Sequence, residues 1–468
     1  MPQYNIFKDS DIDPLGEGLF NVLEKVGVLI QNEEILQAVG RFGGKIDTAN
    51  ERVLIPRDVS RRLLETLRDE TTKHPATTPD RFRAPSPPTI DTQIAQLYYD
   101  YATGDRRGGN SKDFVSLIKL GVALHPDVPV GHSLLLTDVP ASIEPLHAAL
   151  LMAEYAPDSV GAFAWRVDQV DVLREMGDIL GKPDWFSWGA TCFAHPLRFD
   201  KDVTDKFVRR AKEGSTCGLT AMPIAGATTP ITMAGFVAVA GAEMFATWLA
   251  ARAVNPEVPL NGSIWGGSLD MKTGEASYSS FDGMFYAFCL EEFLRKWCGM
   301  AISVGGGEYS DARHPGYYAA YEKAYKAMTI ATFTGQHPGI GQGMLEIGKT
   351  ISPVQLLLER DLTTGAAFYG RTVDTSPDAL CMDEIVDVGF GIDKSYLATE
   401  TTLREYRQHL WCPAWMERDG WRGVETDTKV LDRLQQEVND LIASYKKPDV
   451  DPGTLAEMRR VIDRANKA

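Results

Sequence analysis

One repeating pattern of apolar and polar positions covers the middle of the chain. Helix-like composition and spacing predict helices at 112–124, 142–155, 167–180, 203–213, 231–255, 280–298 and 316–332. Short apolar runs between them predict strands at 128–134, 159–165, 185–191, 216–223, 258–265 and 301–304. Glycine or proline punctuates this alternation, so we expect a turn between strand and helix.

The strand, turn and helix alternation predicts an α/β protein. About seven or eight strands alternate with helices over residues 89–370, which favours a (β/α)8 TIM barrel over an open doubly wound sheet. The sequence has neither a GxGxxG after its first strand nor a GxxxxGK[ST], so dinucleotide and P-loop nucleotide sites have no support. In a barrel, we expect the chemistry at the carboxyl ends of the strands.

The flanking segments differ from this repeat. Residues 1–88 combine helical spacing, a short strand at 52–56 and a proline-rich stretch at 71–88, which predicts an N-terminal α/β accessory segment and a linker. Residues 371–468 predict a C-terminal helical extension. Its last helices, at 427–446 and 452–467, have alternating charges, which indicates a solvated face or an oligomer contact.

Composition then limits the partners and the compartment. The 468 residues are 44% hydrophobic and carry a formal net charge of -16, with no compensating basic block. Nucleic acid and anionic membranes are therefore unfavourable partners. The start of the chain lacks the pattern of a signal peptide, and no apolar run of about 20 residues occurs. We expect a soluble, cytoplasmic protein.

The cysteines give no sign of a metal site. Six of them are scattered without a CxxC or a Cys/His pair at ligand spacing. In a large protein of a reducing compartment, such cysteines are usually small buried apolar residues. We predict no metal.

Aromatic residues gather where the predicted strands end. They are Trp165, Trp188, Phe193, Trp265 and Tyr309. Aromatic rings at a barrel mouth attract a quaternary ammonium ion at roughly 0.5 to 2 kcal/mol per contact. The alternative is that these large rings fill the barrel core. We predict Trp165, Trp265 and Tyr309 as substrate-binding residues.

Polar residues near the same strand ends complete the candidate site. Glu308 follows the glycines after strand 301–304, and it could face a cation or cap the next helix. His195 and His337 each precede a proline in a loop after a strand, and either could be a structural histidine. Arg166 could bind a carboxylate or lie solvated at the surface. We predict Glu308 and His337 as catalytic, and His195 and Arg166 as substrate-binding, whereas Asp270 and Asp311 look like loop caps.

Several sequence blocks resemble the trimethylamine methyltransferase (MttB) family of corrinoid-dependent methyltransferases. These blocks are ATGDRRGGNSKDF, PIAGATTPITMAGFVAVAGAEMF, SDARHPGYYAAYEKAYKA, GQGMLEIGKTISPVQLLLERDL and YLATETTLREYRQHLWCP, and the similarity extends over nearly the whole chain. The founding enzymes of that family carry pyrrolysine in the barrel, whereas residues 305–343 here are all ordinary amino acids. The chain therefore resembles the non-pyrrolysine branch.

The resemblance implies a methyl transfer from glycine betaine, or a close quaternary amine, to Co(I) of a separate corrinoid (cobalamin) protein. The chain has no DxHxxG cobalamin-binding motif of its own. A quaternary nitrogen leaves as a neutral amine, so no general acid is required, and the barrel must orient the donor and exclude water. Two alternatives stay open: another donor such as carnitine, proline betaine or a sulfonium, or a non-catalytic betaine-binding protein. A homo-oligomer is also expected.

Overall fold

The computed structural model of the chain describes residues 5–74, 89–335, 340–416, 418, 420 and 426–467. Its mixed α/β composition confirms the predicted class, and each helix predicted between 112 and 332 is present. The helices of this part are α4 (Ser111–Leu124), α5 (Glu144–Tyr155), α6 (Asp168–Ile179), α7 (Lys201–Lys212), α8 (Met233–Val254), α9 (Phe281–Cys298), α10 (Tyr317–Thr334) and α11 (Pro353–Phe368).

Polar residues fix where several of these helices begin. The Asn110 side chain accepts from Lys112 and Asp113 at the start of α4, and the Asp113 carboxylate accepts from the Asn110 amide in return. Thr232, Ser280 and Ser352 cap α8, α9 and α11 in the same position, because each side-chain oxygen accepts a free amide of the first turn.

The strands are shorter than their apolar runs suggest. They are β4 (Leu97–Asp100), β5 (Asp105–Gly108), β6 (Ala162–Phe163), β7 (Phe186–Ser187), β9 (Cys217–Ala221), β10 (Ile224–Ala225), β11 (Leu260–Ile264), β12 (Gly267–Leu269), β13 (Ala276–Ser277), β14 (Ser303–Val304), β15 (Met344–Leu345) and β16 (Thr350–Ile351). The run predicted as a strand at 128–134 forms only an isolated parallel bridge, between Leu134 and Ala95.

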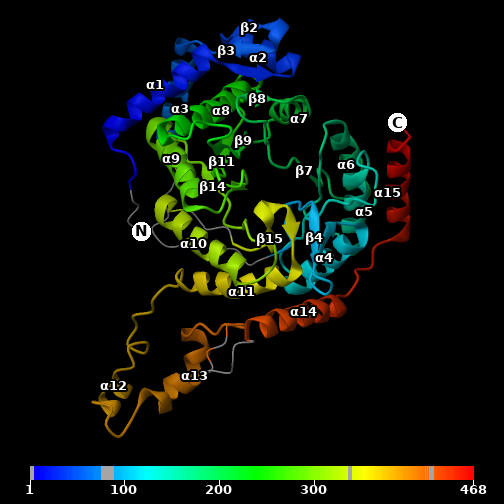
Figure 1. Cartoon of the computed structure of the whole chain (residues 1–468). Helices are drawn as coiled ribbons and strands as arrows, with labels where there is room; N and C mark the ends of the chain where they lie inside the picture. The colour runs from blue at the N-terminus through cyan, green and yellow to red at the C-terminus, as the bar shows by residue number, and fades with distance from the viewer. Residues whose placement is uncertain are drawn as a thin grey trace.

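Successive strand segments are hydrogen-bonded in chain order. Segment 130–135 bonds to residues 90–95, and the Val160 amide donates to the Val130 carbonyl. β6 pairs in parallel with β7, the Thr220 amide donates to Thr191, and β9, β11 and β14 form one parallel sheet. In Figure 1 this sheet lies inside the molecule, with α8, α9 and α10 around it.

Two small sheets follow the carboxyl ends of these strands. One has the order β15-β16-β4-β5, and the other has the order β10-β12-β13. The hairpins β4–β5 and β12–β13 are antiparallel and were not predicted from the sequence. Both contribute side chains to the candidate site.

The N-terminal segment packs on the central α/β part of the chain. Its elements are α1 (Asp9–Lys25), β1 (Val28–Ile30), α2 (Glu33–Phe42), β2 (Lys45–Asp47), the short 3-10 helix η1 (Thr48–Asn50), β3 (Arg52–Leu54) and α3 (Arg57–Lys73). β1 pairs in parallel with β8 (Arg198–Phe199), and α1 packs on α8 and α9. The start of the predicted linker belongs to α3, and residues 75–88 lie outside the described part.

The C-terminal extension contains α12 (Met382–Val388), the 3-10 turn η3 (Tyr396–Ala398), α13 (Glu400–His409), α14 (Thr426–Ser444) and α15 (Pro452–Ala465). The last two helices were predicted to have a solvated face or an oligomer contact, and they also contribute to the core. Leu434 of α14 and Met458 of α15 are fully buried there. α14 packs on α4 and α11, and α15 packs on α5 and α6. α12 and α13 instead project from the body of the molecule (Figure 1).

Helix α8 is long and largely buried. It is the one described helix long and apolar enough to span a membrane, yet 72% of that apolar window is buried inside the protein. Phe236, Phe245 and Trp248 on α8 are fully buried. These features are typical of a core helix.

Candidate functional site

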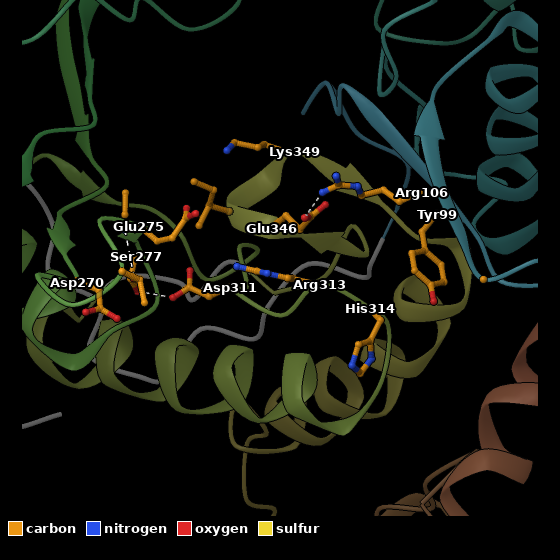
Figure 2. A pocket seen from close by; sticks show the side chains of 14 residues that line it. Tyr99, Arg106, Asp270, Glu275, Ser277, Asp311, Arg313, His314, Glu346 and Lys349 are labelled. Atoms are coloured by element: carbon orange, nitrogen blue, oxygen red, sulfur yellow. Dashed lines mark hydrogen bonds and ion pairs between the residues drawn. The ribbon is translucent and has the colours of Figure 1, made fainter.

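A cavity of about 1010 Å³ opens beside the carboxyl ends of the strands. Four loop regions supply its side chains, as Figure 2 shows. They are Tyr99 and Arg106 of the β4–β5 hairpin, Asp270, Glu275 and Ser277 of the β12–β13 hairpin, Asp311, Arg313 and His314 after β14, and Glu346 and Lys349 between β15 and β16. The lining is rich in charges of both signs.

Two of these charges pair with each other, while others do not. Arg106 forms an ion pair with Glu346, whose other carboxylate oxygen accepts from Thr350. Arg313 and Lys349 have no carboxylate partner within the described part of the chain, and both are exposed. Two cationic side chains therefore face the cavity free to bind an anionic group.

Asp311 is a half-buried carboxylate at the edge of this cavity, and it bonds to the β12–β13 hairpin instead of capping its own loop, as the sequence had suggested. Its Oδ2 accepts from the Ser277 hydroxyl, and its Oδ1 is buried without a partner among the described residues. Burial raises the pKa of the Asp311 carboxyl. Asp270, in contrast, caps its own turn by accepting from the Lys272 amide at 2.8 Å.

A network of buried charges lies under the cavity, on the inner face of α10. Lys323 and Glu359, both fully buried, form an ion pair. Lys326 donates to the Tyr309 carbonyl at 3.0 Å, and burial lowers its pKa to about 8. The nearby Glu308 carboxylate opposes this shift. Glu308 is half-buried, so it lies between this network and the solvent.

Trp265 and Tyr309, predicted from the strand ends, lie next to each other. Their ring centroids are 6.4 Å apart at an interplanar angle of 36°. The glycine run after β14 makes room for the indole, because a Cβ on Gly305 would lie 2.2 Å from the Trp265 ring. A Cβ on Gly348 would likewise lie 2.3 Å from the Tyr309 ring. Neither ring lines the cavity, but Gly348 follows Ile347, which does, so the Tyr309 ring lies close to that wall.

Trp165 belongs to a different cluster. Its indole Nε1 donates to Glu144 at 2.8 Å, and Glu144 also contacts His132 at 3.1 Å. The ring packs edge-on against Phe163 and is 37% exposed. No ring contact between described residues joins Trp165 to the Trp265–Tyr309 pair. The neighbouring Arg166 is exposed and forms a surface ion pair with Asp168.

Both ring nitrogens of His195 are engaged inside the protein. Nε2 accepts from the Met222 amide at 3.0 Å, so Nδ1 carries the proton and donates to Glu243 at 2.9 Å. Direct contact with a substrate would require one of these bonds to break. The histidine therefore fixes the end of β9. His337 lies outside the described residues.

The structure adds four residues that reasoning from the sequence did not select: Tyr99, Arg106, Arg313 and Lys349. A signal for Arg106, Arg313 and Lys349 was present, because they lie within the blocks ATGDRRGG, SDARHPG and LEIGKT that carry the family resemblance. Within the described residues, no three His, Cys, Asp or Glu side chains are grouped closely enough to hold a metal ion.

Comparison with known proteins identifies related chains. The family described as Trimethylamine methyltransferase (MTTB) matches residues 1–468. A glycine betaine methyltransferase of Desulfitobacterium hafniense is 23% identical over 100% of this chain and 98% of its own length. A trimethylamine methyltransferase of Methanosarcina mazei is 26% identical over 59% of this chain and 55% of its own length. Another, from Desulfitobacterium hafniense, is 22% identical over 82% of this chain and 78% of its own.

Proposed function

The chain belongs to the trimethylamine methyltransferase family, and on this premise we propose that it transfers a methyl group from glycine betaine, or a close quaternary amine, to Co(I) of a separate corrinoid protein. One observation supports this proposal most directly. Side chains of both charges, without partners of the opposite charge among the described residues, line one cavity beside an aromatic pair. A zwitterionic betaine carries one charge of each sign.

The strand segments are hydrogen-bonded to one another in chain order, and this order is the basis of a proposal about the fold. We propose that residues 89–370 close into a (β/α)8 TIM barrel, with residues 1–88 as an accessory segment and linker, and residues 371–468 as a C-terminal extension. The ordered bonding from segment 90–95 to β14 supports it. The cavity would then occupy the mouth of the barrel, where such enzymes place their active sites.

The chemistry sets what the protein must do. The corrinoid, carried by the partner protein as the methyl acceptor, supplies the Co(I) nucleophile. The leaving amine is neutral, so its departure needs no proton from a side chain. The protein therefore has to hold the donor in line and keep water from the reacting centre.

Each end of the donor has candidate partners in this site. Trp265 and Tyr309 would hold the ammonium by cation–π attraction, with Glu308 as a nearby negative charge. Arg313 would bind the carboxylate, because a guanidinium offers two parallel N–H donors. The predictions for Trp165, Arg166, His195 and His337 remain predictions, and the first three belong to other contacts in this structure.

We also propose a cytoplasmic homo-oligomer. All six cysteines are free, which fits a reducing compartment. Many apolar side chains on the projecting segment around α12 and α13 are exposed, which fits association with a second copy.

The direct test is spectroscopic. The protein is mixed with the reduced corrinoid carrier or with reduced free cobalamin, and glycine betaine, carnitine, proline betaine and trimethylamine are added separately. Loss of the Co(I) spectrum with glycine betaine, together with dimethylglycine formation, supports the proposal. Conversion with another amine alone would assign that donor instead. Tight betaine binding without conversion by the carrier would indicate a binding protein.

A further inference from the structure

A second cavity, of about 130 Å³, lies against the parallel sheet and shares no lining residue with the large cavity. Segment 189–191, β9, β11 and the start of β14 form its walls. Its polar side chains are Thr191, Arg210, Thr220, Asn261, Ser263 and Ser303. Asn261 and Ser303 are exposed, so the cavity is accessible to solvent.

Arg210 reaches this cavity from helix α7. Its Nη1 donates to the Gly189 carbonyl at 3.2 Å, which anchors the guanidinium at the strand layer. Gly189 has a φ of 66°, and a Cβ there would lie 1.3 Å from the Phe163 ring. Only glycine permits this turn. The carbonyl that holds Arg210 therefore belongs to a residue whose backbone conformation is fixed by its surroundings.

No carboxylate balances the charge of Arg210. Within the described residues it forms no ion pair, and its Nε is buried without a hydrogen-bond partner. Its neighbour on the same helix, Arg209, pairs with both Asp171 and Glu213. Burial lowers the pKa of Arg210, although a guanidinium stays protonated. A partly buried cation without a counter-charge is unfavourable, and an anion would offset this cost.

The other walls suit an anion that accepts hydrogen bonds. Four hydroxyl side chains line the cavity, and no Asp or Glu lines it to repel a negative charge. Ser263 donates its hydroxyl proton to Thr220 Oγ1 at 3.1 Å, and Ser303 donates to the Gly262 carbonyl at 3.5 Å. The hydroxyl groups of Thr191 and Thr220 therefore remain as donors toward the space. Water could satisfy the free N–H groups, but it would not supply the missing negative charge.

We propose that this cavity binds one small oxyanion, held by the Arg210 guanidinium and the surrounding hydroxyl groups. The space corresponds to about four water molecules at roughly 30 Å³ each, so a phosphate, sulfate or carboxylate group fits. The inference does not depend on the proposed methyl transfer, because it rests on Arg210 and its surroundings.

Calorimetric titration with inorganic phosphate, at constant ionic strength, tests the site on the full chain. We expect saturable binding to the native protein and to Arg209→Gln, which removes the neighbouring paired arginine. Arg210→Gln should bind at least about tenfold more weakly, as expected for losing a charge-assisted contact. No saturable binding to the native protein, or equal binding by Arg210→Gln, would overturn the proposal.

A second variant covers the case in which Arg210→Gln does not fold, as judged by circular dichroism. Thr220→Val keeps the guanidinium and removes one hydroxyl donor, so phosphate affinity should fall. Unchanged affinity in this folded variant, with Arg210→Gln unfolded, would also overturn the site.

Competition then distinguishes two sources of the oxyanion. Glycine betaine and choline share a quaternary ammonium, but choline lacks the carboxylate. Displacement of phosphate by glycine betaine and not by choline would assign the site to a donor carboxylate. Displacement by neither would assign it to an inorganic anion, and both results retain an oxyanion site. Displacement by choline alone would count against it.

Discussion

Arg313 and Arg166 are two arginines with different surroundings. Arg313 lines the large cavity without a described carboxylate partner, whereas Arg166 pairs with Asp168 at the surface. We expect Arg313→Ala to weaken glycine betaine binding at least about tenfold, since it removes a charge-assisted contact. Calorimetry measures this, with Arg166→Ala as the matched variant.

Tetramethylammonium separates loss of the carboxylate contact from general damage, because it has no carboxylate. Arg313→Ala should bind this ion as the native protein does. If Arg166→Ala lost glycine betaine affinity and Arg313→Ala kept it, the original prediction for Arg166 would stand and the role of Arg313 would fail.

Trp265 should matter for the cationic end of the donor. Trp265→Ala removes one ring of the aromatic pair, so the dissociation constants of glycine betaine and tetramethylammonium should both rise, by about 3- to 30-fold. Trp188→Ala is the control, because Trp188 packs against Phe186. Equal affinities for Trp265→Ala and the native protein, with both folded, would remove Trp265 from the site.

These residues also show how far the sequence could predict the site. Trp265 and Tyr309 were found because each lies near the carboxyl end of a predicted strand, where a barrel keeps its functional groups. Arg313 lies nine positions beyond the end of β14, in a loop that follows no periodic pattern. His195 satisfied the same positional rule as Trp265, and its bonds to Met222 and Glu243 become visible only in three dimensions.

Helix α10 places charged residues on its inner face, and one of them, Lys326, makes the free energy of unfolding depend on pH. Burial lowers the pKa of Lys326 to about 8, below its ordinary value of 10.5. Between these values the unfolded chain holds this proton and the folded chain does not. This lysine therefore makes the free energy of unfolding rise with pH from about 8 to 10.5.

Urea unfolding at pH 7.5 and pH 10 measures this contribution, for the native protein and Lys326→Met. The native protein should gain stability relative to the variant at the higher pH. Lys349→Met, which removes an exposed lysine, controls for the loss of one cation. A stability difference that stays constant between the two pH values would contradict the proposed environment of Lys326.

Among the elements, helices were predicted more accurately than strands. Helices α8 and α9 begin and end within two residues of the predicted limits, because their length and their caps leave clear signals. The strands are often only two residues long, as β6 and β7 are, so an apolar run overstates them. The β4–β5 hairpin has the sequence LYYDYATGDRRG. Its second strand is charged, as edge strands often are, so it has no apolar run from which a strand could be predicted.

The whole molecule exposes apolar side chains unevenly. Of its 25 exposed large hydrophobic residues within the described part, 14 lie between positions 369 and 416, the segment that projects in Figure 1. Phe390 is 100% exposed and Leu397 is 78% exposed. Monomeric proteins rarely expose so many large apolar side chains in one segment, which supports the predicted homo-oligomer. We predict that the projecting segment forms the contact of this oligomer.

Sedimentation velocity on the full chain tests this assignment. The native protein should sediment as a dimer or larger assembly of its 51.6 kDa chain, and Phe390→Glu/Leu397→Glu should shift it toward the monomer. Buried carboxylates without partners are unfavourable, so a contact through this segment cannot accommodate both substitutions. Met271→Glu/Phe281→Glu places the same charges on exposed apolar positions of the body, and it should leave the assembly intact. A monomeric native protein would remove the oligomer itself, whereas an intact Phe390→Glu/Leu397→Glu assembly would move the contact to another surface.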